Sequence, residues 1–210
     1  MKLEGMKINF LGDSITDGHA TTGPDKIFHQ LIKEKYNLKC ANNFGLGGTR
    51  IARQHVPSNP TRWDLTFELR ADTMPRDVDA NVVLGGVNDY NHGDAPFGEI
   101  DSSDPFTFCG AVNSLITKFQ TDFPDSKLIF LTPLHKEYDT VPCKPDSKIL
   151  SDYVDAIVEI CQKRNVAVID LFKINPLDPY DKEYIPDGLH PNDAGHRVMA
   201  EVIGEELMKL

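Results

Sequence analysis

The chain has 210 residues, 40% of them apolar and 26% charged, which is typical of a single globular domain over residues 1–210 that buries its own core. Its formal net charge of −10 and its lack of a basic run argue against nucleic acid as a partner. No apolar run approaches the ~18 residues of a membrane span, and the N-terminus has no signal peptide, so we expect a cytoplasmic protein without membrane insertion.

The first half of the chain alternates between predicted strands and helices. An apolar run at residues 7–11 predicts the first strand, and an amphipathic pattern at 27–36 predicts a short helix after it. A second strand is expected at 38–42 and a third at 80–84, with a weaker helical pattern at 63–69 between them. These strands are near-continuous apolar runs, which are typical of parallel strands covered on both faces.

The second half continues the same alternation. An apolar stripe over residues 108–119 predicts a long helix, and a strand is expected at 127–131. The next helix has its apolar positions within 150–161, with Ser147 as its expected cap. A fifth strand is expected at 166–171.

A last helix begins at about Asn192, so strand and helix alternate five times along the chain. Right-handed crossovers between such elements produce a doubly wound parallel sheet with helices on both sides. Long loops follow the strands and should meet at the carboxyl edge of the sheet, where open α/β sheets bind ligands. The approximate bounds of these loops are 50–62, 88–106, 132–146 and 173–190.

Polar residues that suit nucleophilic catalysis stand at this edge. Ser14 follows the first strand within Gly-Asp-Ser and is a candidate nucleophile. A serine hydroxyl needs a base near neutral pH, and His190 is the candidate for that base. Asp187 lies three residues before His190, so one turn brings its carboxylate to the ring, which it can orient.

A nucleophilic serine also needs hydrogen-bond donors for the tetrahedral oxyanion. The glycine-rich loop after the second strand offers a backbone N–H, with Gly48 as the candidate, and Asn88 offers a side-chain amide. Each such donor typically contributes about 10²–10³ in rate. Because each of these short motifs alone is also a common turn or helix cap, only their combination points to catalysis.

Four motifs, in this order, resemble the GDSL esterases and lipases, also called SGNH hydrolases. The motifs are Gly12-Asp13-Ser14-Ile15, Asn43 through Gly48, Gly85-Gly86-Val87-Asn88, and Asp187 through His190. They span nearly the whole chain, and Ile15 stands where the family usually has leucine. The resemblance implies a three-layer α/β/α sandwich of flavodoxin-like type, with a five-stranded parallel sheet.

The resemblance also implies a role for each motif residue. Ser14 is expected to be the nucleophile, with His190 as its base and Asp187 orienting the base. The oxyanion hole is expected to comprise the backbone N–H groups of Ser14 and Gly48 and the side-chain amide of Asn88. The same loop holds two other glycines as close alternatives to Gly48.

The family's members act on acetylated sugars, lysophospholipids, thioesters and small synthetic esters. Four polar side chains near the strand ends are expected to contact the substrate: Asp13, Asp89, His92 and His135. A polar rim in the neighbouring loops favours a short acyl group on a polar, carbohydrate-like alcohol; its residues are Asn91, His92, Asp94 and Asp139. A longer acyl chain, as in a lysophospholipase or thioesterase, would need an apolar groove, for which the candidates are Phe97, Phe106, Phe108 and Tyr138.

Other functions remain as alternatives. An O-acyltransferase would use the same acyl-serine but pass the acyl group to a hydroxyl acceptor. A non-catalytic binding module would keep the fold without turnover, which the complete set of motif residues argues against. The glycines at residues 45–50 resemble a dinucleotide loop, but the third glycine of GxGxxG is missing.

A metal site is the last alternative. Asp187, His190 and Asp193 have side chains that ligate metals, but a metal on His190 would deny Ser14 its base. The four cysteines also lack metal-ligand spacing. We therefore expect a small-molecule ester substrate, with neither a metal nor an organic cofactor. Nothing in the long loops requires a second copy of the chain, and homo-oligomerisation stays open.

Overall fold

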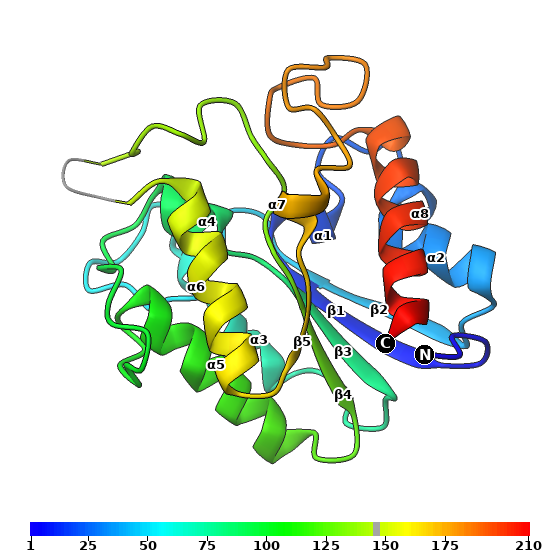
Figure 1. Cartoon of the computed structure of the whole chain (residues 1–210), viewed down its shortest axis with the longest axis horizontal. Helices are drawn as coiled ribbons and strands as arrows, with labels where there is room; N and C mark the ends of the chain where they lie inside the picture. Colours follow the sequence, from blue (N-terminus) through cyan, green and yellow to red (C-terminus); the bar gives the residue numbers. More distant parts are fainter. Residues whose placement is uncertain (145–147) are drawn as a thin grey trace.

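Five parallel strands form one sheet, with helices packed on both of its faces (Figure 1). The computed structural model describes residues 1–144 and 148–210. The strands are β1 (Lys7–Gly12), β2 (Cys40–Gly45), β3 (Ala80–Leu84), β4 (Lys127–Leu131) and β5 (Ala167–Ile169). Their order, β2-β1-β3-β4-β5, is that of a flavodoxin-like doubly wound sheet, so the predicted fold class is confirmed.

Three strands differ from the prediction, β1 only by ending one residue later at Gly12, whereas β3 and β4 begin and end where their apolar runs placed them. β2 begins at Cys40 rather than at residue 38 and continues to Gly45, because it pairs with β1 in register as far as Gly12. β5 has only three residues. It stops at Asp170, whose side chain caps the short helix α7 (Leu171–Ile174).

The longer helices divide between the two faces of the sheet. α2 (Phe28–Tyr36) and α8 (Asp193–Lys209) pack together on one face, and the other is covered by α3 (Phe67–Ala71), α5 (Phe108–Asp122) and α6 (Leu150–Lys163) (Figure 1). Two short helices follow β1 and β3 at the carboxyl edge: α1 (Ser14–Asp17) and α4 (Val87–Asn91). Two 3₁₀ turns lie at Pro24–Lys26 and Thr61–Asp64.

The starts of two helices also differ from the prediction. Residues 63–69 do not form one helix, because the 3₁₀ turn at Thr61–Asp64 ends before α3 begins at Phe67. The predicted cap of α6, Ser147, lies outside the described residues. At the start of α6, the Asp152 carboxylate accepts a 2.9 Å hydrogen bond from the backbone N–H of Ile149.

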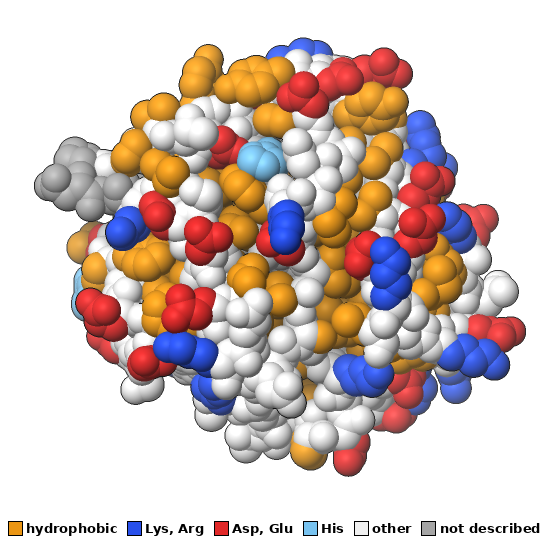
Figure 2. Space-filling view, viewed as in Figure 1, with side chains coloured by type: hydrophobic (Ala, Val, Ile, Leu, Met, Phe, Trp, Pro, Cys, Tyr) orange, Lys and Arg blue, Asp and Glu red, His pale blue; other side chains and the backbone are white. Residues whose placement is uncertain are grey.

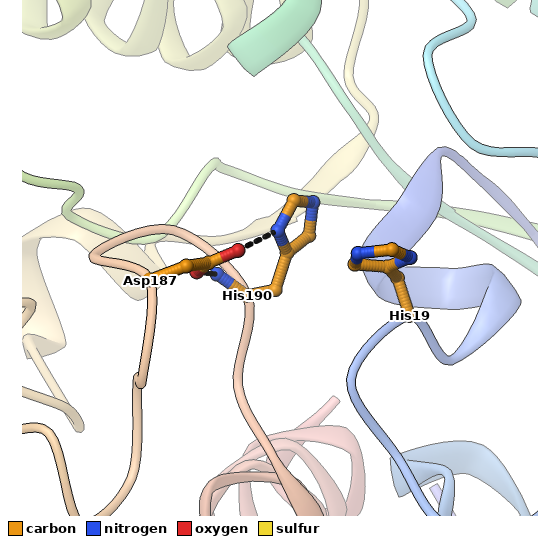
Figure 3. A group of neighbouring side chains, drawn as sticks. All are labelled: His19, Asp187 and His190. Carbon is orange, nitrogen blue, oxygen red and sulfur yellow. Dashed lines mark hydrogen bonds and ion pairs between the residues drawn. The ribbon is translucent and has the colours of Figure 1, made fainter.

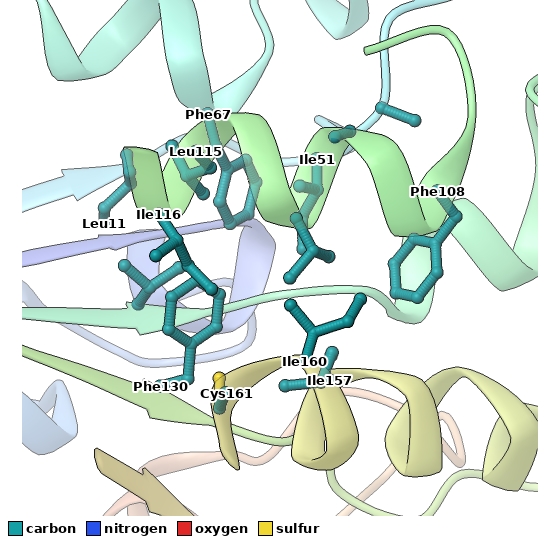
Figure 4. Packing of buried hydrophobic residues seen from close by; sticks show 14 of the residues in the cluster. Leu11, Ile51, Phe67, Phe108, Leu115, Ile116, Phe130, Ile157, Ile160 and Cys161 are labelled. Atoms are coloured by element: carbon teal, nitrogen blue, oxygen red, sulfur yellow. The ribbon is translucent and has the colours of Figure 1, made fainter. Parts of the chain in front are cut away.

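Side chains alternate along the strands and so fill both layers between sheet and helices. On three adjacent strands, the residues directed toward α3, α5 and α6 are Leu11, Val83 and Phe130 (Figure 4). Their chain neighbours pack with α2 and α8 instead: Phe10, Val82 and Ile129. All six side chains are at most 1% exposed. Because both faces are buried, the strands read as continuous apolar runs.

A chain of asparagines links three strands inside this core. Asn9 on β1 donates from Nδ2 to Asn81 Oδ1 on β3 at 2.9 Å, and its own Oδ1 accepts from Asn42 Nδ2 on β2 at 2.9 Å. Asn81 in turn donates to Ser126 Oγ at 2.7 Å. The sheet register places the three asparagines opposite one another, so each amide satisfies its neighbour.

Replacing Asn9 by alanine should destabilise the fold without altering the carboxyl edge of the sheet. The change leaves Asn81 Oδ1 and Asn42 Nδ2 without these partners, at ~1–3 kcal/mol for each buried group left unpaired. Urea unfolding measures the loss, and Gln162→Ala, which removes an exposed amide on α6, is the matched control. A free energy of unfolding equal to that of the control would contradict this role of the asparagines.

The surface carries charges of both signs. In Figure 2, acidic and basic side chains are interspersed with apolar patches over the described part of this face. Among the described residues, no helix has the length and apolarity needed to span a membrane. Burial raises the pKa of the Cys109 thiol to about 11 and that of Cys161 to about 12, so both behave as inert core residues.

Candidate active site

Ser14 lies at the sharp turn from β1 into α1. The turn is tight enough that a Cβ at Gly12 would lie 2.0 Å from Thr16 Oγ1. Asp13 caps α1, since its carboxylate accepts a 3.1 Å hydrogen bond from the backbone N–H of Ile15. The local sequence therefore holds Ser14 at the carboxyl edge of the sheet, where 9% of the residue stays exposed.

A chain of hydrogen bonds joins Ser14 to two residues near the other end of the sequence. Ser14 Oγ lies 2.9 Å from His190 Nε2, and His190 Nδ1 lies 2.6 Å from Asp187 Oδ2 (Figure 3). Because the Asp187 carboxylate accepts at Nδ1, the ring carries its proton on that nitrogen. The lone pair on Nε2 is then directed at the serine hydroxyl.

The turn from Asp187 to His190 holds both side chains in place. Asp187 Oδ1 accepts from the backbone N–H of Leu189 at 3.0 Å and of His190 at 2.7 Å, while Oδ2 faces the ring. Burial acts to raise the pKa of Asp187, but these hydrogen bonds outweigh it and lower the pKa to about 2. The carboxylate is therefore ionised throughout the neutral range.

Three glycines stand at the end of β2 and in the loop after it, next to α1 and Trp63. A Cβ at Gly45 would lie 2.1 Å from the backbone of α1, and one at Gly47 would lie 3.6 Å from Ser14 Cβ. Gly48 has a left-handed φ of +81°, and a Cβ there would lie 2.0 Å from Nε1 of the half-buried Trp63. Only glycine fits this position, both for its backbone conformation and for the approach of the indole.

Asn88 projects from α4 toward the same loop. Its Nδ2 donates to the backbone oxygen of Thr49 at 3.0 Å, and only 6% of the residue is exposed. The amide thus lies against the segment that follows Gly48. The structure brings all five motif residues to one edge of the sheet: Ser14, Gly48, Asn88, Asp187 and His190.

Comparison with known protein families agrees with this arrangement. The model of the GDSL-like lipase/acylhydrolase family matches residues 10–198, from β1 into α8. The chain belongs to this family. It is therefore a hydrolase of GDSL type, and the resemblance carried by the four motifs is confirmed.

Solved structures share the fold of this GDSL hydrolase along its length. A protein from Lactobacillus plantarum is 29% identical, with a TM-score of 0.83 and 98% of each chain covered. An acetyl xylan esterase, AlAXEase, is 22% identical, with a TM-score of 0.63 over 96% of this chain and 99% of that chain. A two-domain esterase described as active on acetylated mannans is 20% identical, with a TM-score of 0.60 over 98% of this chain and 49% of that chain. No curated protein sequence matches.

Two carboxylates expected to contact the substrate point into this GDSL hydrolase instead. Asp13 is 1% exposed and burial raises its pKa to about 7, while Asp89 is 5% exposed and burial raises its pKa to about 6. The two oxygens of Asp89 accept from the backbone N–H groups of Ile51 at 3.0 Å and Ala52 at 2.9 Å. Asp13 and Asp89 therefore both hold backbone segments around the site, and Asp13 also lines a narrow cavity next to it.

The two histidines expected to contact the substrate are both half-buried. His92 stacks on Trp63 with ring centroids 4.8 Å apart, beside Asn88. His135 packs its ring 3.6 Å from that of Phe172, and its Nδ1 lies 2.6 Å from an oxygen of Asp139. Both therefore border the site from loops that follow β3 and β4.

His19 is a residue of this site that the sequence analysis does not single out. It is exposed, its ring lies 4.4 Å from that of His190, and it stands on the side of His190 away from Asp187 (Figure 3). In the sequence, the feature that could have indicated His19 is its position five residues after Ser14. In the structure, the backbone N–H of His19 donates to the oxygen of Ser14 at 2.9 Å.

The same cluster is where a metal ion would find ligands in the described part of the chain. His19, Asp187 and His190 offer ligand atoms within 4.8 Å of one another. Asp193, considered as a ligand from the sequence, instead binds the backbone N–H of Thr22 at 2.8 Å. A metal at this cluster would engage the ring of His190 and so compete with its use as a base.

Proposed function

We propose that this hydrolase is a serine esterase, with Ser14 as the nucleophile, His190 as its base and Asp187 orienting the base. The observation that carries this assignment is the unbroken chain of hydrogen bonds from Asp187 through both ring nitrogens to Ser14 Oγ, at 2.6 and 2.9 Å. A serine hydroxyl becomes an effective nucleophile only when a positioned base accepts its proton.

In the proposed reaction, Ser14 Oγ attacks the ester carbonyl carbon while its proton passes to His190 Nε2. The bond to the alcohol oxygen then breaks, and His190 returns the proton to that oxygen. A water molecule, deprotonated by the same nitrogen, attacks the acyl-serine and releases the acid. Asp187 stays ionised and stabilises the imidazolium. The cycle balances without a metal or an organic cofactor.

We assign the oxyanion to three donors, the backbone N–H groups of Ser14 and Gly48 and the amide of Asn88. Within the described residues, neither backbone N–H donates to a protein acceptor. Asn88 uses one amide proton on Thr49 and has a second for the oxyanion. Donors held in place before the reaction stabilise the developing charge most effectively, because they need no reorganisation.

Two spaces next to the motif residues support a short acyl group on a polar alcohol. One is a narrow cavity lined by chain neighbours of Ser14 and His190, among them Asp13, Ile15 and Leu189. Its volume of about 10 Å³ gives room for roughly one water molecule or a methyl group. A wider hollow of about 250 Å³ is lined by Trp63, His92, Val56 and mostly polar side chains. The acetyl-glycan esterases with the same fold agree with such a substrate.

Three of the four aromatic residues considered for a lipid groove pack against other rings. Phe97 and Phe108 pack against Tyr153 in the core, with ring centroids 5.1 and 4.6 Å from that of Tyr153. Phe106 stacks on His55. Tyr138, the fourth candidate, is 67% exposed. Because the other three rings are engaged in these contacts, a lysophospholipase or a long-chain thioesterase is disfavoured.

Hydrolysis of p-nitrophenyl acetate, butyrate and octanoate at neutral pH tests this assignment. We expect kcat/KM to be highest for acetate and lowest for octanoate, because the narrow cavity accepts only the first carbons of the chain. A preference for octanoate would overturn the short-acyl assignment. If an added excess of a polyol received the acyl group in place of water, the protein would be an O-acyltransferase.

A further inference from the structure

His92 makes two hydrogen bonds that together determine which of its nitrogens is protonated. Its Nδ1 lies 3.1 Å from Arg50 Nη1, and its Nε2 lies 3.3 Å from Asn88 Oδ1. A guanidinium can only donate, so Nδ1 must be the unprotonated acceptor. The ring proton is therefore on Nε2, which donates it to the carbonyl oxygen of the Asn88 amide.

This donor leaves the Asn88 amide only one favourable orientation. In that orientation Oδ1 accepts from His92, and Nδ2 donates one proton to Thr49 O. With the amide reversed, its NH₂ group would face the N–H of His92 and its oxygen would face the carbonyl of Thr49. Both contacts would be repulsive, so the second proton on Nδ2 has a determined direction.

His92 is itself held from two sides. Arg50 is 2% exposed, and its Nη2 donates to Asp64 Oδ1 at 2.8 Å, which keeps the guanidinium directed at the ring. The ring of Trp63 lies 4.8 Å from that of His92, tilted by 37°, and Trp63 also lies against Gly48. Burial, together with the nearby charge of Arg50, lowers the pKa of His92 to about 4, so the ring stays neutral near neutral pH.

We propose that His92 is a positioning residue which, supported by Arg50, directs the free N–H of Asn88 at the oxyanion. This role rests on the proposed function, because Asn88 has an oxyanion to bind only if Ser14 attacks an ester carbonyl. His92 acts on the oxyanion through Asn88, and it also lines the hollow proposed for the alcohol. The test therefore uses p-nitrophenyl acetate, whose leaving group is not the polar alcohol proposed for that hollow. With this ester, the contribution of His92 should appear in kcat and leave KM nearly unchanged.

Two amide substitutions at His92 separate the hydrogen bond that it accepts from Arg50 from the one that it donates to Asn88. In His92→Asn, the side-chain oxygen can replace Nδ1 as the acceptor for Arg50, but nothing reaches Asn88. In His92→Gln, the longer side chain can place an N–H donor where Nε2 stood. Both variants lose the ring that stacks on Trp63, so they differ mainly in the hydrogen bond to Asn88.

With p-nitrophenyl acetate we expect His92→Asn to lower kcat about tenfold, less than the 10²–10³ of a lost oxyanion donor, with little change in KM. His92→Gln should recover most of this loss. His55→Asn is the control, since His55 is an exposed histidine that stacks on Phe106 in the neighbouring loop. Thermal unfolding identifies any variant that fails to fold, and His92→Phe, which keeps a ring over Trp63, then replaces it.

A double-mutant cycle with Asn88 distinguishes positioning from a general structural effect. Asn88→Ala should lower kcat by about 10²–10³, and adding His92→Asn to it should have almost no further effect. If His92→Asn lowered kcat equally in both backgrounds, or did not lower it at all, His92 would not act through Asn88. If the wild type hydrolysed no ester, or did so without Ser14, the proposed function itself would fail.

Discussion

Replacement of Ser14 by alanine should abolish ester hydrolysis, lowering turnover by about 10⁴–10⁶. The alanine side chain has no atom that can attack the carbonyl or form the acyl intermediate. The loss should appear in kcat, because the donors of Gly48 and Asn88 remain able to bind the carbonyl. The assay is p-nitrophenyl acetate hydrolysis, with the thermal unfolding midpoint measured in parallel.

Covalent labelling gives a second readout for Ser14 that does not depend on the choice of ester. A fluorophosphonate should add once to the wild type and not at all to Ser14→Ala, as judged by intact mass. Ser151→Ala, on α6, is the matched serine control and should keep both labelling and turnover. Turnover that persists in Ser14→Ala would show that another residue attacks the ester, and the Gly-Asp-Ser segment would then be only a turn.

Replacement of Asp187 by asparagine should lower kcat by about 10⁴ while leaving the fold intact. The backbone N–H groups of Leu189 and His190 already donate to Oδ1, so the amide oxygen of asparagine would stay there. The NH₂ group would then face Nδ1 of His190, which would have to accept. The ring proton would move to Nε2 and point at Ser14, and the ring could no longer take the serine proton.

The matched control for Asp187 is Asp193→Asn, six residues further along the chain. The Asp193 carboxylate binds Thr22 and takes no part in the chain of hydrogen bonds to Ser14. We expect this variant to keep wild-type kcat. The lowered pKa of Asp187 means that the fold stabilises its carboxylate, and the side chain is 49% exposed, so its asparagine variant should unfold only slightly below the wild-type temperature. Wild-type kcat in Asp187→Asn would exclude it as the group that orients His190.

Much of the fold could be predicted because parallel strands covered on both faces must be apolar along their whole length. β3 and β4 follow this rule apart from Asn81 and Lys127 and were placed residue for residue. β2 did not, since Asn42 and Asn43 look like loop residues in the sequence. The partner of Asn42 inside the sheet is Asn9, which lies on a different strand. Its assignment to a strand therefore depended on pairing that no local pattern records.

The candidate site also has features that the sequence predicted and features that it did not. The order of motifs placed a serine, a glycine loop, an asparagine and an Asp-x-x-His turn after the first, second, third and fifth strands, and this was enough to expect a common edge. The order of motifs did not predict the direction in which each side chain points. Asp13 and Asp89 are polar and stand at strand ends, yet both turn inward, because backbone N–H groups there need acceptors.

The sequence by itself determined which chemical groups stand at the strand ends, and with them the family and the order of the strands. Only the tertiary structure decided which groups meet. It joined Ser14 to His190 across 176 positions of the chain, set His19 beside the same ring, and linked Arg50 through His92 to Asn88. The physical reason is that hydrophobic period and turn chemistry act over a few residues. The orientation of a side chain depends instead on the donors and acceptors that packing brings from distant loops.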